Sequence, residues 1–208
     1  NRLLSQDSTG KWIVWDVNNR KQIVYGNYAS YVDLKGSTVA ILIDKEVQLL
    51  SASDGSLMSK IEINGSYSNL GLSVDGSYFW ITTSSSLGIW SLHGKQIYKY
   101  DGDYSKAKIY ADTKEIRVAN GASGSNVIEN ITINGGKLNR SIFSIGTFYS
   151  WFLDGSHFLA VTNEYIYVYS SDSTLMDFIK NNTIEELGGS GQYFWTLGKI
   201  YKIGNGDI

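Results

Sequence analysis

Three sequence markers recur in step along the 208 residues and constrain the fold more than any other feature. One series of turn dipeptides has spacings of 36, 39, 42, 37 and 33 residues: Asn18-Asn19, Asp54-Gly55, His93-Gly94, Gly135-Gly136, Asp172-Ser173 and Asn205-Gly206. A second series opens at Gly36, Gly76, Thr113, Gly155 and Gly191, and a third consists of the words GNYAS, GSYSN, GDYSK and GTFYS. A period of about 37 residues indicates repeats of one supersecondary unit.

Each period contains four runs of strand length, separated by clusters of Gly, Asn, Asp and Ser. The third period reads NLGLSV, YFWITT, LGIWSL and KQIYKYD, and the fifth reads FYSWFL, HFLAVT, YIYVYS and TLMDFI. Four short antiparallel strands in about 40 residues form one blade of a β-propeller. The sequence therefore predicts an all-β fold, a single β-propeller domain of about six four-stranded antiparallel blades, at residues 1–25, 31–64, 69–100, 106–143, 148–180 and 184–208.

The first and last blades are expected to be incomplete in this chain. The first period lacks an opening strand, and the last period stops at Asp207-Ile208, where a fourth strand should start, which gives 22 strands. We therefore expect the chain to be part of a longer one, or a flanking segment of the same or another chain to close the ring.

The second run of each period is apolar and the fourth is polar. In DGSYFWITT, Tyr78, Phe79 and Trp80 stand side by side, which suits a mid-blade strand covered on both faces by neighbouring blades. Polar residues such as Lys95 and Lys99 suit an outermost strand, because polarity discourages pairing with other chains. The run DSTLMDFIK has a helical stripe but occupies a fourth-strand place, so we predict a strand there.

Composition excludes several classes of site. The chain has no cysteine and two histidines, so it lacks the ligands of a usual zinc or copper site, and no metal site, catalytic residue or cofactor is predicted. A net charge of −2 argues against nucleic-acid binding, and no apolar run reaches the length of a membrane span. Abundant Ser, Gly, Thr, Asn and Tyr are typical of an exported β-protein, which favours an extracellular or bacterial cell-envelope location.

Two third-strand endings resemble a known repeat family. IVWDV, from Ile13, and GIWSL, from Gly88, are similar to the Trp-Asp ending of WD40 repeats. Asp7, Asp44 and Asn163 stand between second and third strands, where that family favours an acidic residue. WD40 repeats usually have Gly-His ahead of the first strand, where this chain has Gly-x-Tyr or Gly-x-Phe. The chain therefore resembles a divergent WD40-like or quinoprotein-like β-propeller. The resemblance implies a β-propeller fold.

The Gly-x-Tyr and Gly-x-Phe positions are the first candidate binding loops. They place Tyr28, Tyr67, Tyr104 and Phe148 at equivalent points of four periods. These rings either form an aromatic surface on one face of the propeller or pack at the start of their own blades. Repetition favours packing, because sites usually break the symmetry of a repeat.

The fourth period supplies the second candidate. Glu115 and Arg117 share one strand face where other periods have aromatic residues, and a polar loop from Asn120 to Asn126 follows. Either the loop is a recognition loop beside the charged pair, or this blade face is less buried and carries a cross-strand ion pair.

Three functional hypotheses follow, in order of support. The first is a non-catalytic propeller that acts as a rigid scaffold and binds another protein through loops on one face. The second is an exported or cell-surface propeller that binds glycans through exposed tyrosines. The third is a hydrolase or quinoprotein-type enzyme centred on the channel, which no constellation of acids, bases or ligands supports.

Overall fold

The computed structural model describes residues 1–63, 65–105, 107–111, 115–120, 127–134, 137–144, 150–153, 157–162, 164–170, 174–180, 187–190, 193–196, 199–203 and 206–207. Every regular element in these ranges is a β-strand, which confirms the predicted all-β class. The chain forms two compact units, Asn1–Ser105 and Lys106–Ile208, called here the N-terminal and C-terminal units.

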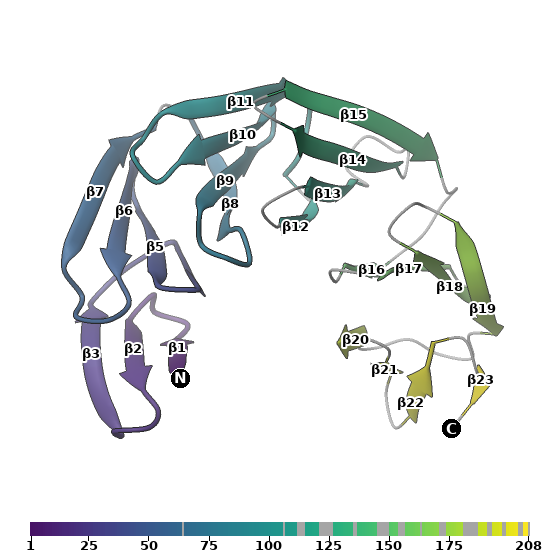
Figure 1. Cartoon of the computed structure of the whole chain (residues 1–208), viewed down its shortest axis with the longest axis horizontal. Helices are drawn as coiled ribbons and strands as arrows, with labels where there is room; N and C mark the ends of the chain where they lie inside the picture. The colour runs from purple at the N-terminus through teal and green to yellow at the C-terminus, as the bar shows by residue number, and fades with distance from the viewer. Residues whose placement is uncertain are drawn as a thin grey trace. The chain divides into compact units, whose positions relative to one another are not determined.

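The N-terminal unit contains three antiparallel sheets whose strands follow chain order (Figure 1). The first holds β1 (Arg2–Gln6), β2 (Trp12–Asp16) and β3 (Lys21–Gly26). The second holds β4 (Tyr31–Lys35), β5 (Thr38–Ile43), β6 (Glu46–Ser51) and β7 (Leu57–Glu62). The third holds β8 (Tyr67–Leu72), β9 (Tyr78–Thr83), β10 (Ser86–Ser91) and β11 (Gln96–Asp101).

The C-terminal unit contains three four-stranded antiparallel sheets of the same order. They are β12 (Lys108–Ala111), β13 (Glu115–Asn120), β14 (Val127–Asn134) and β15 (Lys137–Ser144); β16 (Ser150–Leu153), β17 (His157–Val161), β18 (Tyr165–Ser170) and β19 (Leu175–Lys180); and β20 (Leu187–Ser190), β21 (Tyr193–Thr196), β22 (Lys199–Lys202) and β23 (Gly206–Asp207). β23 pairs with β22, so the described strands number one more than the sequence predicted. The helical stripe of DSTLMDFIK lies in strand β19, as expected from its place in the period.

The second strand of a sheet is buried on both faces, as the aromatic triplet predicts. In β9, Tyr78, Phe79 and Trp80 expose 5%, 0% and 7% of their surface, and in β5 the run from Thr38 to Leu42 is buried throughout. β5 lies between the first and third sheets and contributes side chains to both cores, so this strand has no solvent face and its sequence need not alternate.

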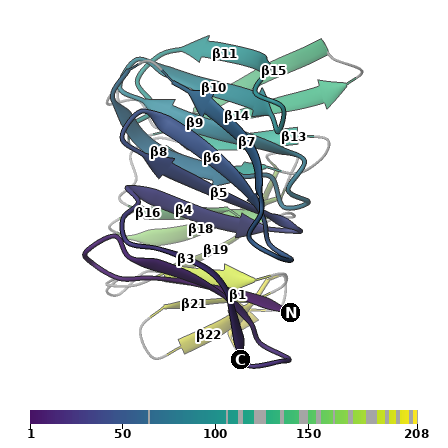
Figure 2. The same ribbon diagram turned by 90° about the vertical axis from the view of Figure 1, so that its left-hand side faces the viewer.

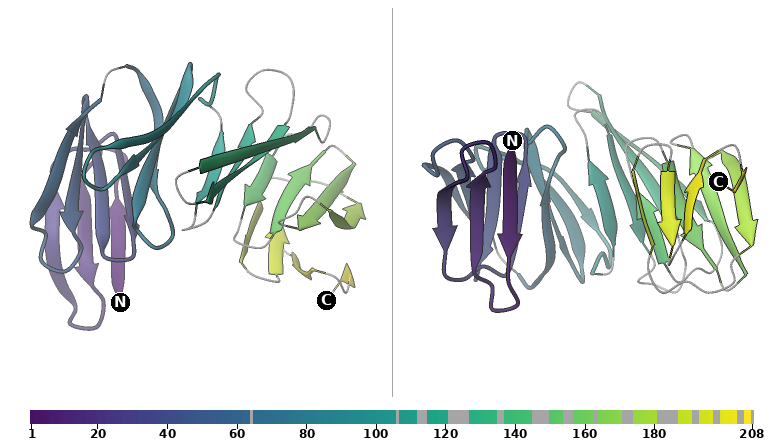
Figure 3. Two further views of the ribbon diagram at one scale, coloured as in Figure 1. Left: turned by 45° about the horizontal axis from the view of Figure 1, so that its top comes forward. Right: turned by 90° about the horizontal axis from the view of Figure 1, so that it is seen from below.

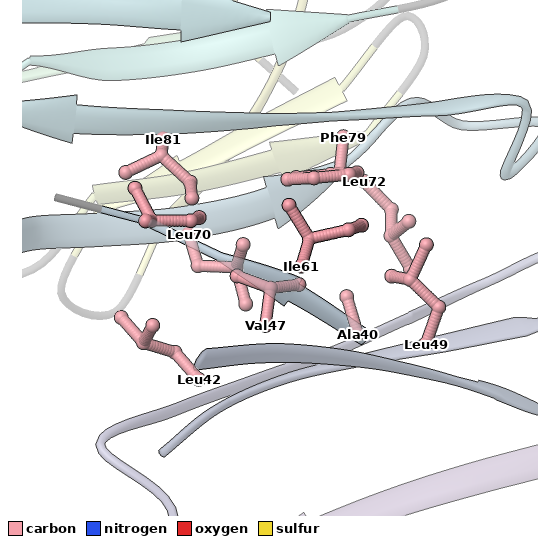
Figure 4. Packing of buried hydrophobic residues seen from close by; sticks show 10 residues of the cluster. Ala40, Leu42, Val47, Leu49, Ile61, Leu70, Leu72, Phe79 and Ile81 are labelled. Atoms are coloured by element: carbon pink, nitrogen blue, oxygen red, sulfur yellow. The ribbon is translucent and has the colours of Figure 1, made fainter. Parts of the chain in front are cut away.

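Apolar side chains from adjacent sheets form the cores of the N-terminal unit. Between the second and third sheets, Val47 and Leu49 of β6 meet Leu70 of β8 and Phe79 of β9 (Figure 4). Burial of one such side chain stabilises a fold by about 1.5–3 kcal/mol. Figure 2 shows the three sheets following one another, from β1–β3 in purple to β8–β11 in teal.

Tryptophan rings of this unit lie over glycines, which explains why Gly occurs within strands. Trp80 covers Gly71 across the β8–β9 pair, and a Cβ on Gly71 would be 2.2 Å from Trp80 Cζ2. Trp90 likewise covers Gly88, and its ring stacks on Phe79 with centroids 5.6 Å apart. A glycine inside a strand marks such a close approach.

A β-bulge recurs between the third and fourth strands of four sheets. The register shifts after Val14 in β2, Leu49 in β6, Ile89 in β10 and Val168 in β18. The inserted residue on the fourth strand is aliphatic each time: Ile23, Met58, Ile97 and Met176. A bulge at a sheet edge increases local twist and interrupts the ladder.

The expected polarity of the fourth strand is only partly observed. Lys99 is exposed as predicted and Lys60 of β7 is exposed too, but β7 also exposes Leu57 and Met58 by 52% and 51%. The edge therefore combines charged residues with the bulge, and both oppose pairing with another chain.

Candidate functional site

The connections between strands gather at two opposite ends of the N-terminal unit (Figure 3, right). One end, called the loop face, comprises residues 7–11, 27–30, 44–45, 63, 65–66, 84–85 and 102–105. The other end, called the turn face, comprises residues 17–20, 36–37, 52–56, 73–77 and 92–95. The predicted Gly-x-Tyr loops of this unit all lie on the loop face.

Main-chain hydrogen bonds fix the loop face. Where the chain passes from one sheet to the next, its amides donate to carbonyls of the nearby hairpin turns. Ile63 N donates to Lys45 O at 2.8 Å, and Gly102 N donates to Ser85 O at 2.8 Å. Each crossing loop is thereby tied to a short turn, so the side chains on this face stand on a preorganised backbone.

The three described tyrosines of the Gly-x-Tyr loops differ in exposure. Tyr28 exposes 52% of its surface, and its hydroxyl lies 3.3 Å from Ser30 Oγ. Tyr67 is half-buried, burial raises its pKa, and its hydroxyl donates to Ile63 O. Tyr104 is buried, with 1% exposed, so its ring packs inside the unit. Phe148 lies outside the described residues.

Strand register shows that Tyr28 and Tyr67 are not equivalent. Tyr67 is the first residue of β8, and the corresponding first residue of β4 is Tyr31, which the repeated words did not reveal. Tyr31 pairs with Leu42 and Tyr67 with Thr83, at the same end of their sheets, and the Tyr31 hydroxyl donates to Ser68 O. Tyr28 precedes its strand by three residues.

Two pockets flank the Asp44–Lys45 turn between β5 and β6. The first, of about 430 Å³, is lined by Ile43, Asp44, Lys45, Glu46, Glu62 and Ile63. The second, of about 340 Å³, is lined by Ser30, Tyr31, Leu42, Asp44, Lys45, Gly65, Ser66 and Tyr67. The turn is therefore a shared wall, with carboxylates on one side and tyrosines on the other. We call the two pockets the paired pockets.

The carboxylates of the first pocket have different surroundings. Glu46 Oε1 accepts hydrogen bonds from Gln48 and Lys60, which lower the pKa of Glu46. Glu62 lies directly across the β6–β7 ladder from Glu46, and two like charges in that position repel each other. Asp44 is exposed and has a φ of 51°, in the left-handed region that Asp tolerates better than most residues.

The second predicted group lies in the C-terminal unit. Glu115 and Arg117 are on β13, and the Arg117 guanidinium, 2% exposed, pairs with the Glu115 carboxylate. The guanidinium carbon also lies 5.7 Å from the centre of the Tyr110 ring, within cation–π range. Asn120 ends β13, and Asn126 lies outside the described residues.

A third pocket lies at the turn face, where Asn1 and Arg2 face Leu34 and Ala52, with a volume of about 480 Å³. Among the described residues, no group of three or more His, Cys, Asp or Glu is placed to hold a metal ion. In that part of the chain there is also no helix suited to cross a membrane.

The sequence matches no protein-family model and no curated protein. Solved structures nevertheless share its fold. Hsv2 from Kluyveromyces lactis aligns with a TM-score of 0.73 at 10% identity, over 97% of this chain and 69% of its own. The β-propeller domain of Cps50 (Swd1) from Myceliophteria thermophila aligns with a TM-score of 0.64 at 11% identity, over 99% of this chain and 81% of its own.

Hydrazine synthase from Kuenenia stuttgartiensis also aligns, with a TM-score of 0.61 at 13% identity, over 93% of this chain and 69% of its own. At such identities the likeness shows the fold alone, and the chain is a divergent β-propeller, as the WD40-like endings indicated. Because one of these similar structures is named as an enzyme, the fold alone does not decide between binding and catalysis.

Proposed function

We propose that the chain is a non-catalytic β-propeller that acts as a rigid scaffold and binds a protein partner through the loop face of its N-terminal unit. The observation that carries this proposal is the paired pockets on either side of Asp44–Lys45. Anchor side chains of a partner segment enter such pockets and contribute most of the binding energy of an interface.

The chemistry of the pocket walls supports a protein partner. Tyr31 and Tyr67 present half-buried rings whose hydroxyls are held by main-chain carbonyls, so the rings lose little freedom when a partner covers them. Aromatic residues of this kind are enriched at protein interfaces. Asp44 and Lys45 stand exposed between the two pockets and can fix the register of a charged segment.

A charge swap tests the proposal. Photo-reactive groups at Lys45 and Ser66 identify the partner, with the exposed Ile97 of β11, which lies on neither face, as the reference position. The purified partner is then titrated against the wild type, against Asp44→Lys/Lys45→Glu, and against Lys99→Asp/Asp101→Lys, which swaps an exposed ion pair away from the pockets. All three proteins have the same net charge.

We expect the first swap to weaken binding by about tenfold, equivalent to about 1.4 kcal/mol, and the second to leave it unchanged. The proposal is wrong if both swaps have the same effect, or if no protein cross-links through the loop face.

Glycan binding is the second candidate, and the exposed ring of Tyr28 favours it. A flat exposed ring can stack on the apolar face of a sugar. The buried ring of Tyr104 cannot take part, which removes one of the three described tyrosines from this hypothesis. Tyr28→Ala should abolish retention on sugar-coated beads while Tyr98→Ala, on β11, retains it; equal retention of both variants argues against the hypothesis.

A further inference from the structure

Hydrogen bonds join neighbouring turns on the turn face of the N-terminal unit, as they do on the loop face. Thr38 Oγ1 donates to Gly76 O at 3.3 Å, which ties the turn before β9 to the turn before β5. Ala52 N donates to Ser37 O at 2.8 Å, which adds the turn before β7. A Cβ added to Gly36 would be 2.6 Å from Asp75 O, so these turns lie close together. Connections from different sheets therefore form one continuous surface.

Four exposed cations at this end form no ion pair with a described residue. Arg20, Lys21, Lys35 and Lys95 are all exposed, and none makes an ion pair with a described residue. They stand in, or directly beside, the turns of all three sheets. Arg2, the fifth cation at this end, pairs with Asp16 at 3.0 Å.

The carboxylates at the same end are engaged within their own turns. Asp54 Oδ1 accepts from Ser56 N and Oγ at 3.0 and 2.7 Å. Asp75 Oδ1 accepts from Ser73 Oγ at 2.7 Å and from Ser77 Oγ at 3.0 Å. Each carboxylate therefore shapes a turn locally, and the four lysine and arginine side chains have no intramolecular counter-charge among the described residues.

The loop face has the opposite balance. It and the adjoining strand ends carry more carboxylates than cations, and two of the lysines there, Lys60 and Lys99, are within 3.1 Å of Glu46 and Asp101. The six carboxylates are Asp7, Asp44, Glu46, Glu62, Asp101 and Asp103. Although the whole chain is nearly neutral, the two ends of this unit thus differ in sign.

Aliphatic side chains stand among the cations of the turn face. Val17, Leu57 and Val74 expose 47%, 52% and 49% of their surface, and each lies in a turn or next to one. Met58, the bulge residue of β7, exposes 51% beside Leu57. An apolar surface interspersed with cations is complementary to a segment that alternates acidic and apolar residues.

We infer that the turn face is a second docking surface and binds an acidic segment of a partner protein. Lys35 and Lys95 pair with its carboxylates, while Val74 and Leu57 cover its apolar side chains. Together with the partner proposed for the loop face, the chain then bridges two proteins, one at each end of the N-terminal unit. This inference does not depend on what occupies the loop face, since the two surfaces share no residue.

A matched pair of charge variants tests this inference. Lys35→Gln/Lys95→Gln removes two cations from the turn face, and Lys11→Gln/Lys99→Gln removes two from the other end, so net charge falls equally. The probes are a fluorescent peptide of Asp, Glu and Leu residues, its counterpart with Asn and Gln in place of the acids, and phosphatidylcholine vesicles with and without phosphatidylserine. Circular dichroism confirms that each variant is folded.

We expect the acidic peptide to bind the wild type severalfold more tightly than the amide peptide, with an affinity that falls as salt screens the charges. Lys35→Gln/Lys95→Gln should lose most of this preference and Lys11→Gln/Lys99→Gln should keep it. Equal losses in both variants, or equal binding of both peptides, overturn the inference. Binding to phosphatidylserine vesicles without binding to the peptide also overturns it, in favour of a membrane surface.

A third variant checks the apolar part. Leu57→Ser/Val74→Ser keeps every charge and should weaken the acidic peptide severalfold; an unchanged affinity would mean that charge alone recruits the peptide and that no docking surface exists. The loop-face swap Asp44→Lys/Lys45→Glu should leave peptide binding intact, so failure of the scaffold proposal is distinguishable from failure of this one.

Discussion

The second and fourth strands of one sheet show how position governs sequence. In β9 five consecutive residues, from Tyr78 to Thr82, are buried, whereas in β11 only Tyr100 is. Both strands are rich in aromatic residues, so residue type does not account for the contrast. Position in the sheet does, because β9 has paired strands on both edges and β11 has one free edge.

The largest expected difference in the free energy of unfolding is between alanine substitutions of two phenylalanines. Phe79 of β9 is fully buried and stacks on Trp90, while Phe178 of β19, a fourth strand, exposes 58% of its surface. We expect Phe79→Ala to lower the free energy of unfolding by about 3–5 kcal/mol and Phe178→Ala by less than about 0.5 kcal/mol. Urea unfolding followed by tryptophan fluorescence measures both. Similar losses would show that burial does not separate the two strand types.

A smaller effect is expected from filling the space under a tryptophan. Gly71→Ala places a methyl group 2.2 Å from the Trp80 ring, which must shift from its packed position. Overpacking of this kind costs about 1–3 kcal/mol. Ser59→Ala on β7, a fourth strand, is the control and should change the urea midpoint little. A Gly71→Ala variant as stable as the wild type would mean that Trp80 has room to move.

The turn that leads into β9 provides a pH-dependent prediction. Burial raises the pKa of Asp75, but hydrogen bonds from Ser73 and Ser77 outweigh it and hold the pKa below the usual 3.8. A group whose pKa is lower in the folded state stabilises the fold above its unfolded-state value and loses that contribution as the pH falls. Asp75→Asn should therefore cost about 1 kcal/mol at neutral pH and less in acid. A cost that does not change with pH contradicts this assignment.

The smallest expected effect concerns an ion pair on a fourth strand. Lys60 Nζ lies 3.1 Å from Glu46 Oε1, and the lysine side chain is 52% exposed. Lys60→Gln should shift the urea midpoint slightly at low salt and not at all at high salt, because exposed charges are screened. Persistence of the shift at high salt would show that Lys60 contributes through packing of its methylene groups.

Repeat period and strand order were predictable from sequence because each strand carries its own pattern. The Tyr78-Phe79-Trp80 triplet predicted a doubly covered strand, and the place of DSTLMDFIK in its period correctly outweighed its helical stripe. The repeated segments GNYAS and GSYSN placed Tyr28 and Tyr67 at equivalent positions, but the strand register does not. The loop before β4 has more residues between Gly and strand than the loop before β8, so Tyr28 stands in a loop where Tyr67 starts a strand.

The paired pockets and the bulges could not be predicted from sequence. One pocket is formed at the ends of β5, β6 and β7 and the other between the second and third sheets, and no word in the sequence marks Asp44–Lys45 as their common wall. The bulge residues include Met58 and Ile97, and isoleucine also occurs in regular pairing, as Ile81 of β9 does. What the sequence lacks in both cases is information about neighbours that are distant along the chain.

The recurring bulge has a consequence for whether copies of this chain associate at high concentration. On β3, β7, β11 and β19 an additional residue shifts the hydrogen-bonding register of the amides and carbonyls on the outer edge partway along the strand. A second copy that tried to extend the ladder would match one half of the strand and miss the other. The outer strands can thus expose apolar residues such as Met58 without pairing edge to edge with other copies.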